Sequence, residues 1–255
     1  MTTQIIVVAL LRNNEEYLRF LENNSSDNTR TLLNDFADKN PRAQNLYLDL
    51  EDYKNTGTNF ERTDRLAFLR NKAMQFALKA VVQKDAWMLL IDSDIYFELD
   101  VLGKLLAKRP RELNIGLLSA FSLEGVRTDN QIRTAGHYYD TFAFVGLDGR
   151  NHRPRCVFSD CRLCGIGKLD RSNDIIDVRS CYNGFALLDA DLMVTYFDRV
   201  KWDTIDIEGI RSLCEHVLFC DRLRTATGAR VCVATDVDRV FWGLEIIVPQ
   251  KQKLL

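Results

Sequence analysis

The chain has 255 residues, with 34 Lys and Arg against 36 Asp and Glu, and therefore a formal net charge of −2. This length predicts one large domain, and the lack of a basic stripe or tail argues against binding to nucleic-acid phosphates. No apolar run approaches the roughly 20 residues of a membrane span, and the first residues lack the charged region of a signal sequence. We therefore expect a cytoplasmic protein with no transmembrane segment and no nucleic-acid partner.

The first third of the chain alternates between strand and helix patterns. A continuous apolar run at 5–11 predicts a strand that is buried on both faces of a parallel sheet. A short strand is expected at 19–22, and polar residues at 23–29 can cap the helix that follows. A third strand is expected at 46–50, and apolar residues at helical spacing predict a helix at about 63–83.

The next predicted strand ends in two carboxylates. Residues 87–91 are an apolar run of strand length, and Asp92 and Asp94 follow, one residue apart. Such side chains point to opposite faces of a strand, so the pair can share one ion only where the strand ends and the chain bends. Carboxylates in this position are typical of Mg²⁺ or Mn²⁺ sites, which keep other coordination positions for water and substrate phosphates. We predict a metal held by Asp92 and Asp94 and a nucleoside diphosphate as ligand; a solvated pair of turn aspartates is the alternative.

The second half of the chain contains fewer regular patterns. Residues 123–180 combine charges, glycines and cysteines with weak periodicity, so we expect loops there with one or two short strands. Outside this stretch the patterns predict a helix at 98–108, a strand at 114–121, a strand at 184–188, a helix at 190–197, a helix at 213–226 and a strand at 229–234.

This order of elements predicts an open, mostly parallel α/β sheet flanked by helices, whose ligands gather outside the carboxyl ends of the strands. Arg12, Asn23 and Asp92 each follow the end of a predicted strand, and we expect them to converge on one site. Parallel neighbours need a crossover of about a dozen residues or more, which the short connection between the first two strands does not supply. We favour a missing or shortened crossover helix; the alternatives are strands that are not parallel neighbours, or a helix at 12–22.

Five segments resemble motifs of nucleotide-sugar glycosyltransferases of the GT-A fold. They are Arg12-Asn13-Asn14-Glu15 after the first strand, residues 22–29, Arg70-Asn71-Lys72-Ala73, Ile91-Asp92-Ser93-Asp94 as an Asp-X-Asp metal motif, and residues 215–224. Within that superfamily the chain is most similar to the fungal capsule-associated α-mannosyltransferases, through residues 65–71, Cys181-Tyr182-Asn183-Gly184 and Glu215-His216. It departs from the pattern in the first crossover helix and at His216, which replaces the usual Asp.

The resemblance implies a metal-dependent hexosyltransferase that moves a hexose, with mannose as the expected sugar, from a UDP- or GDP-sugar to a glycan or glycoconjugate. Mn²⁺ or Mg²⁺ is the implied cofactor, with Asp94 as the more direct ligand and Asp92 reaching the ribose or the metal through water. The resemblance also divides the single domain of residues 1–255. Residues 1–122 are expected to be the nucleotide- and metal-binding half, 123–245 the acceptor-side half and 246–255 a tail.

Other candidate site residues have structural alternatives. Arg70 can offer a planar donor fork to a phosphate or to Asp92, or it can be an ion-paired residue of the helix surface. For transfer with inversion, Glu215 at the start of a helix is the candidate base, while the alternative is a glutamate that complements the helix dipole. In a retaining enzyme Glu215 would instead position the acceptor. His216 is a candidate third metal ligand or a structural histidine, and Trp242 belongs either to the core or to a sugar-binding surface.

Two other functions remain open. A sugar nucleotidyltransferase shares a similar sheet, but it normally needs a Gly-rich phosphate loop after the first strand, where this chain has Arg12 and two asparagines. A non-catalytic glycan-binding module with a degenerate fold is made plausible by the shortened first unit.

Seven cysteines, an odd number, cannot all pair within one chain. Cys214, Cys220 and Cys232 stand among apolar residues, which predicts reduced core thiols. The remaining four, Cys156, Cys161, Cys164 and Cys181, include only one two-residue spacing, so structural thiols or a lone disulfide are favoured over a zinc site.

Overall fold

A central sheet of eight strands organises the described part of the chain. The computed structural model describes residues 5–11, 21–23, 25–40, 43–49, 59–79, 81, 84–128, 131–138, 140–149, 171–206, 208–212 and 214–242. Arg12 lies outside these residues, as do Cys156, Cys161, Cys164 and the predicted tail. In spatial order the strands are β3 (Leu46–Leu48), β2 (Leu21–Asn23), β1 (Ile5–Leu11), β4 (Trp87–Asp92), β10 (Phe185–Asp189), β6 (Ile115–Ala120), β11 (Arg230–Ala234) and β9 (Ile175–Asp177).

The four strands at one end of this sheet, from β3 to β4, are all parallel. β1 pairs in parallel with both β2 and β4, and β2 pairs in parallel with β3. Beyond β4 the direction changes, because β10 runs antiparallel to β4 and β6, and β9 runs antiparallel to β11. The predicted open α/β sheet is therefore confirmed. β1 and β2 are parallel neighbours, so the alternative in which the first two strands are not parallel neighbours is excluded. The connection between them at 12–20 lies outside the described residues, and the shortened crossover helix stays a prediction.

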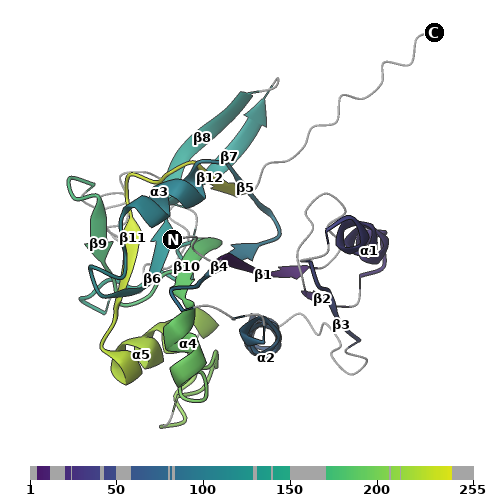
Figure 1. Cartoon of the computed structure of the whole chain (residues 1–255). Coiled ribbons are helices and arrows are strands. Elements are labelled where there is room, and N and C mark those ends of the chain that lie inside the picture. Colours follow the sequence, from purple (N-terminus) through teal and green to yellow (C-terminus); the bar gives the residue numbers. More distant parts are fainter. Residues whose placement is uncertain are drawn as a thin grey trace.

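Helices cover both faces of the sheet (Figure 1). They are α1 (Thr29–Lys39), α2 (Asn59–Leu78), α3 (Val101–Ala107), α4 (Ala190–Tyr196) and α5 (Glu215–Thr227). α2, α4 and α5 lie along one face and α3 along the other. This arrangement explains the continuous apolar run of β4: Met88 and Leu90 pack in the core formed with α2, α4 and α5, whereas Trp87, Leu89 and Ile91 pack in the core formed with α3.

A second, four-stranded sheet extends from the end of β4. Its strands are β5 (Ile95–Phe97), β12 (Val240–Trp242), β7 (Ser122–Thr128) and β8 (Gln131–Tyr138), in that spatial order. Within 123–180, where loops with one or two short strands are expected, β7 and β8 are seven and eight residues long and form a hairpin, so these strands are longer than expected. Asp129 and Asn130 stand between the two strands, and both residue types favour hairpin turns, so the sequence did carry a signal for this hairpin.

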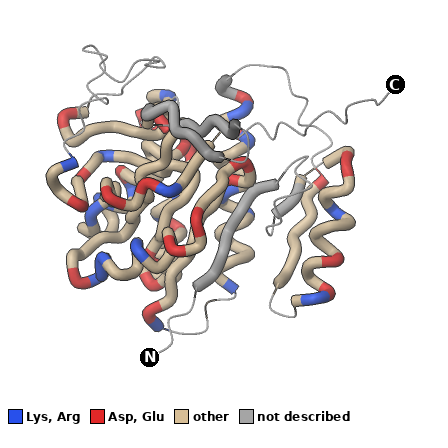
Figure 2. The backbone as a smooth tube through the Cα atoms, turned by 90° about the horizontal axis from the view of Figure 1, so that it is seen from above, with Lys and Arg blue, Asp and Glu red and all other residues tan. Residues whose placement is uncertain are grey.

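Charged residues show no segregation along the described backbone. In Figure 2 the Lys and Arg positions are interspersed with the Asp and Glu positions, and neither sign gathers on one side. None of the helices in the described ranges combines the length and the apolarity required to cross a bilayer.

Candidate active site

The acidic pair lies where the chain leaves one sheet and enters the other. Asp92 is the last residue of β4, and its backbone N–H donates to the carbonyl oxygen of Gly184 at 2.9 Å. The chain then turns, and β5 begins at Ile95 in the second sheet. The Asp92 side chain is 25% exposed and Asp94 is exposed. The bend that a shared ion requires is therefore present at the predicted place.

The surroundings of Asp94 suit a cation. Its Oδ2 accepts a hydrogen bond of 2.7 Å from the indole Nε1 of Trp242. Partial burial and then the charge of Asp92 raise the pKa of Asp94, while the bond from Trp242 lowers it. Two carboxylates thus lie close enough to repel each other, and oxygen ligands of this kind fit Mn²⁺ or Mg²⁺.

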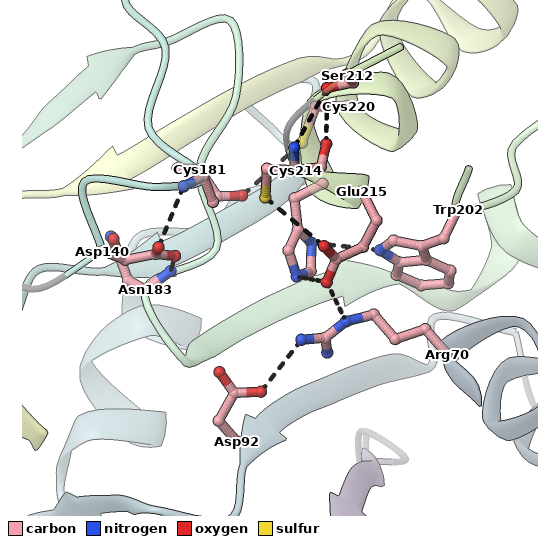
Figure 3. Close-up of polar contacts among 12 residues, drawn as sticks. Arg70, Asp92, Asp140, Cys181, Asn183, Trp202, Ser212, Cys214, Glu215 and Cys220 are labelled. Atoms are coloured by element: carbon pink, nitrogen blue, oxygen red, sulfur yellow. Dashed lines mark hydrogen bonds and ion pairs between the residues drawn. The ribbon is translucent and has the colours of Figure 1, made fainter. Parts of the chain in front are cut away.

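Arg70 of α2 links Asp92 to a buried region (Figure 3). Its Nη2 donates to Asp92 Oδ1 at 3.3 Å and its Nε donates to Glu215 Oε1 at 3.0 Å. The guanidinium also lies over the ring of Tyr182, at 4.6 Å from the centroid. Burial opposes its charge, but the phenol and the two carboxylates raise the pKa of Arg70 well above the ordinary value. The expected contact between Arg70 and Asp92 is therefore present, and the predicted phosphate contact stays a prediction.

Glu215 begins α5 and is only 3% exposed. Its Oε1 accepts from Arg70, and its Oε2 lies 3.8 Å from the sulfur of Cys214. A base must reach the proton that it abstracts, and in this arrangement the carboxylate faces protein groups. The geometry therefore favours a role for Glu215 in holding Arg70 over the expected role as base.

His216 is built into the same buried region. Its Nδ1 accepts from Trp202 Nε1 at 3.2 Å, and its ring stacks on Tyr182 with centroids 4.1 Å apart. Burial, and then the charge of Arg70, lower the pKa of His216 well below its ordinary value, so the ring is neutral. No group of three or more His, Cys, Asp or Glu side chains in the described ranges is arranged to hold a metal. The structure thus does not bring His216 to the acidic pair.

Asn23 is buried at the carboxyl end of β2. β1 lies between β2 and β4 and is parallel to both, so Asn23 and Asp92 stand at the same edge of the sheet. Arg12, the third residue expected at this edge, lies outside the described residues. The nucleotide-binding roles of Asn23 and Arg12 remain predictions.

Sequence reasoning missed Asp140. Its Oδ2 accepts from the backbone N–H of Asn183 at 2.9 Å, and its Oδ1 accepts from that of Ala143 at 3.1 Å. Burial raises the pKa of Asp140 to about 6; the charges of Asp92 and Glu215 act in the same direction and the two N–H groups in the opposite one. The available signal was a single acid within the aromatic stretch from Tyr138 to Phe144.

The turn that Asp140 holds passes directly beside Asp92. Asn183 and Gly184 both have left-handed backbone angles, with φ of 59° and 66°. A Cβ at position 184 would lie 2.6 Å from Ile95 Cγ1 and 3.5 Å from Asp92 Oδ2. Glycine is therefore needed here for its positive φ and for the close approach of the turn to the strand end.

The four described cysteines, Cys181, Cys214, Cys220 and Cys232, are buried free thiols. The predicted reduced core thiols are thereby confirmed. The sulfur of Cys181 lies 3.2 Å from Ser119 Oγ and 3.4 Å from the carbonyl oxygen of Cys232, which fits a structural thiol. Whether the three cysteines at 156–164 bind zinc stays untested, because they lie outside the described residues.

Glycosyltransferases are among the solved structures that are similar to this chain. GalNAc-T7 with UDP, GalNAc and Mn²⁺ has a TM-score of 0.55 and 12% identity, with 94% of this chain and 43% of that chain covered. Mannosyltransferase PcManGT from Pyrobaculum calidifontis, with GDP-Man and Mn²⁺, has a TM-score of 0.49 and 12% identity, with coverage of 99% and 59%. Glucosyl-3-phosphoglycerate synthase from Mycobacterium tuberculosis, with Mg²⁺ and UDP, has a TM-score of 0.45 and 12% identity, with coverage of 94% and 72%. The chain thus spans 43% of the length of the GalNAc-T7 chain and 59% of that of the PcManGT chain.

The family is shown by sequence. No curated protein gives a significant match. A family model described as cryptococcal mannosyltransferase 1, however, matches residues 1–221, which is most of the chain. The chain therefore belongs to the cryptococcal mannosyltransferase 1 family and has the GT-A fold of nucleotide-sugar glycosyltransferases.

Proposed function

We propose that this chain is a metal-dependent glycosyltransferase that moves a hexose, with mannose as the first candidate, from a nucleoside-diphosphate sugar to a glycan or glycoconjugate hydroxyl. The observation that carries the proposal is the pair of carboxylates, Asp92 and Asp94, at the bend between the two sheets. Family membership supports mannose as the sugar. The shared fold with GalNAc-T7, solved with UDP and Mn²⁺, supports a nucleotide-sugar donor and a divalent metal.

In this proposal Asp92 and Asp94 would hold Mn²⁺ or Mg²⁺. The bound metal would supply positive charge that stabilises the diphosphate as it leaves the sugar. Arg70 occupies Oδ1 of Asp92, so it fixes the orientation of that carboxylate and leaves Oδ2 for a ligand.

The buried residues have a supporting role. Glu215 accepts from Arg70 and thereby keeps the guanidinium in place beside Asp92. The rings of His216 and Tyr182 stack on each other, and Tyr182 also contacts the guanidinium of Arg70. The proposal therefore assigns neither Glu215 nor His216 a direct contact with the metal.

The test is nucleotide release from a panel of GDP- and UDP-sugars in the presence of Mn²⁺, with and without glycan acceptors. We expect GDP-mannose to release GDP, and we expect Asp94→Asn to lose both this release and Mn²⁺-dependent nucleotide binding. The proposal fails if no donor releases nucleotide and Asp94→Asn binds nucleotide as well as the unchanged chain does.

Two other measurements separate the alternatives, pyrophosphate release and calorimetry. A sugar nucleotidyltransferase would form a nucleotide sugar from a sugar 1-phosphate and a nucleoside triphosphate, with release of pyrophosphate. A glycan-binding module would bind glycans in calorimetry and show no Mn²⁺-dependent affinity for GDP or UDP.

A further inference from the structure

Trp242 reaches the acidic pair from the last described strand. Its indole Nε1 donates to Asp94 Oδ2 at 2.7 Å across 148 positions of sequence. The sequence leaves this residue open between the core and a sugar-binding surface. We propose that Trp242 is a positioning residue for the metal, which holds the Asp94 carboxylate in the orientation that binds Mn²⁺ or Mg²⁺. This inference rests on the proposed function.

The backbone around Trp242 is firmly placed. β12 pairs antiparallel with β5, which sets Trp242 opposite Ile95, the residue after Asp94. The same strand pairs in parallel with β7 on its other side. Val240 and Phe241 are buried, with 0% and 2% exposure, and Ile95 is 2% exposed. The strand that carries the indole is therefore fixed between two neighbours.

Asp94, in contrast, stands on an exposed turn. A carboxylate on a turn samples several side-chain orientations unless a donor holds it. An indole has one N–H donor and no acceptor, so it can fix Oδ2 while the other oxygen and a remaining lone pair stay available to a cation. Donors behind a metal ligand typically change metal affinity or activity by about 10–100-fold when they are removed.

Trp242 also differs from the other two tryptophans. Trp87 and Trp202 are buried, with 5% and 3% exposure, whereas Trp242 is partly exposed. Trp87 lies at the opposite end of β4 from Asp92, and Arg111 covers its ring. Trp87→Phe is therefore a matched control: it makes the same chemical change on the strand that carries Asp92, but away from the pair.

The test is a calorimetric Mn²⁺ titration of the whole chain in the presence of saturating GDP, and then of UDP. We expect Trp242→Phe to weaken Mn²⁺ binding about 10–100-fold, while Trp87→Phe keeps the affinity of the unchanged chain. Trp242→His should recover most of the loss, because the imidazole retains an N–H donor.

Two further readouts test where the indole lies and what it does for the metal. Bound Mn²⁺ is paramagnetic and should quench the indole fluorescence of the unchanged chain and of Trp87→Phe more than that of Trp242→Phe, which tests whether Trp242 lies beside the ion. In nucleotide-release assays Trp242→Phe should raise the Mn²⁺ concentration needed for half-maximal rate, with little change of kcat at saturating Mn²⁺. Loss of strand packing alone would lower kcat without this shift.

The outcomes distinguish this inference from the proposed function. If the unchanged chain binds Mn²⁺ with nucleotide and Trp242→Phe binds it equally tightly, the inference is overturned and the proposed function stands. Equal losses in Trp242→Phe and Trp242→His also overturn it, because the donor would then be irrelevant. If the unchanged chain shows no Mn²⁺-dependent binding of GDP or UDP, the proposed function itself fails.

Discussion

The two sides of Arg70 present carboxylates in opposite environments (Figure 3). On one side Asp92 is 25% exposed and its neighbour Asp94 is exposed. On the other side Glu215 and His216 are each 3% exposed and surrounded by protein. The difference indicates a division of labour, in which the exposed carboxylates are available to a ligand and the buried one holds the arginine.

The ion pair on the buried side adds little to the stability of the fold. Taking a charged pair out of water costs several kcal/mol per ion, roughly what the pair returns by mutual attraction. A buried Arg70–Glu215 pair therefore contributes little net stability, yet it fixes where the guanidinium points. On the exposed side two like charges lie close together, and the charge of Asp92 raises the pKa of Asp94.

The largest effect should follow from removing Arg70. In Arg70→Ala the Glu215 carboxylate keeps its burial and loses its cation, so we expect the free energy of unfolding to fall by about 3–5 kcal/mol. Urea unfolding measures this loss. The matched control is Arg109→Ala, because that arginine side chain is 74% exposed, and its change should stay within about 0.5 kcal/mol. A loss below about 1 kcal/mol in Arg70→Ala would show that the Glu215 carboxylate does not depend on Arg70 for a charge partner, as an exposed ion pair would not.

Asp94→Asn tests the exposed side and should affect activity more than stability. If Asp94 is the more direct metal ligand, as proposed, its removal should lower the rate of nucleotide release about 10²–10³-fold. The free energy of unfolding should change little, since Asp94 is exposed. Asp198→Asn is the control, because the side chain of Asp198 is 98% exposed and the proposal gives it no function. A rate in Asp94→Asn equal to that of the control would remove Asp94 from the metal site.

The exposed side could be predicted from sequence because its signals are local. An apolar run of strand length followed by two acids places Asp92 and Asp94 at a strand end, and the structure has β4 ending at Asp92. The helix that carries Arg70 follows from 3.6-residue periodicity and is observed as α2.

The buried side could not be predicted because its contacts join distant segments. Arg70 and Glu215 are 145 residues apart, and Asp140 and Asn183 are 43 residues apart. Periodicity reports which face of an element is apolar, but it does not report which polar residues meet. The burial of Glu215 at a helix start, which disfavours its predicted role as base, is a property of packing against other elements.

Asp140 connects the two sides through the turn at Asn183 and should give the protein a pH-dependent stability. Its pKa is about 6 in the folded chain, against roughly 3.9 for an unfolded Asp. Between about pH 4 and pH 6 the folded state therefore binds more protons than the unfolded state. The contribution of Asp140 to the free energy of unfolding is fully present below about pH 4 and is lost as pH rises to about 6, by about 3 kcal/mol in total.

Asp140→Asn removes this titration. As pH rises from 4 to 6, the unfolding free energy of the variant relative to that of the unchanged chain should therefore increase, by up to about 3 kcal/mol. Urea unfolding of both chains at several pH values measures this increase. Asp198→Asn, an exposed substitution, should keep the pH profile of the unchanged chain. Parallel profiles for Asp140→Asn and the unchanged chain would show that this carboxyl titrates normally.

The smallest expected effect tests the neutral histidine. Trp202→Phe keeps an aromatic ring against Phe219, whose centroid lies 3.9 Å from that of Trp202, but it removes the N–H that His216 Nδ1 accepts. Leaving a buried acceptor unpaired should cost about 1 kcal/mol of unfolding free energy. If His216 serves only the buried side, Mn²⁺-dependent nucleotide affinity should not change. A clear fall in that affinity at unchanged stability would instead link His216 to the metal, which is the other role that the sequence left open for it, and would join the two sides into one site.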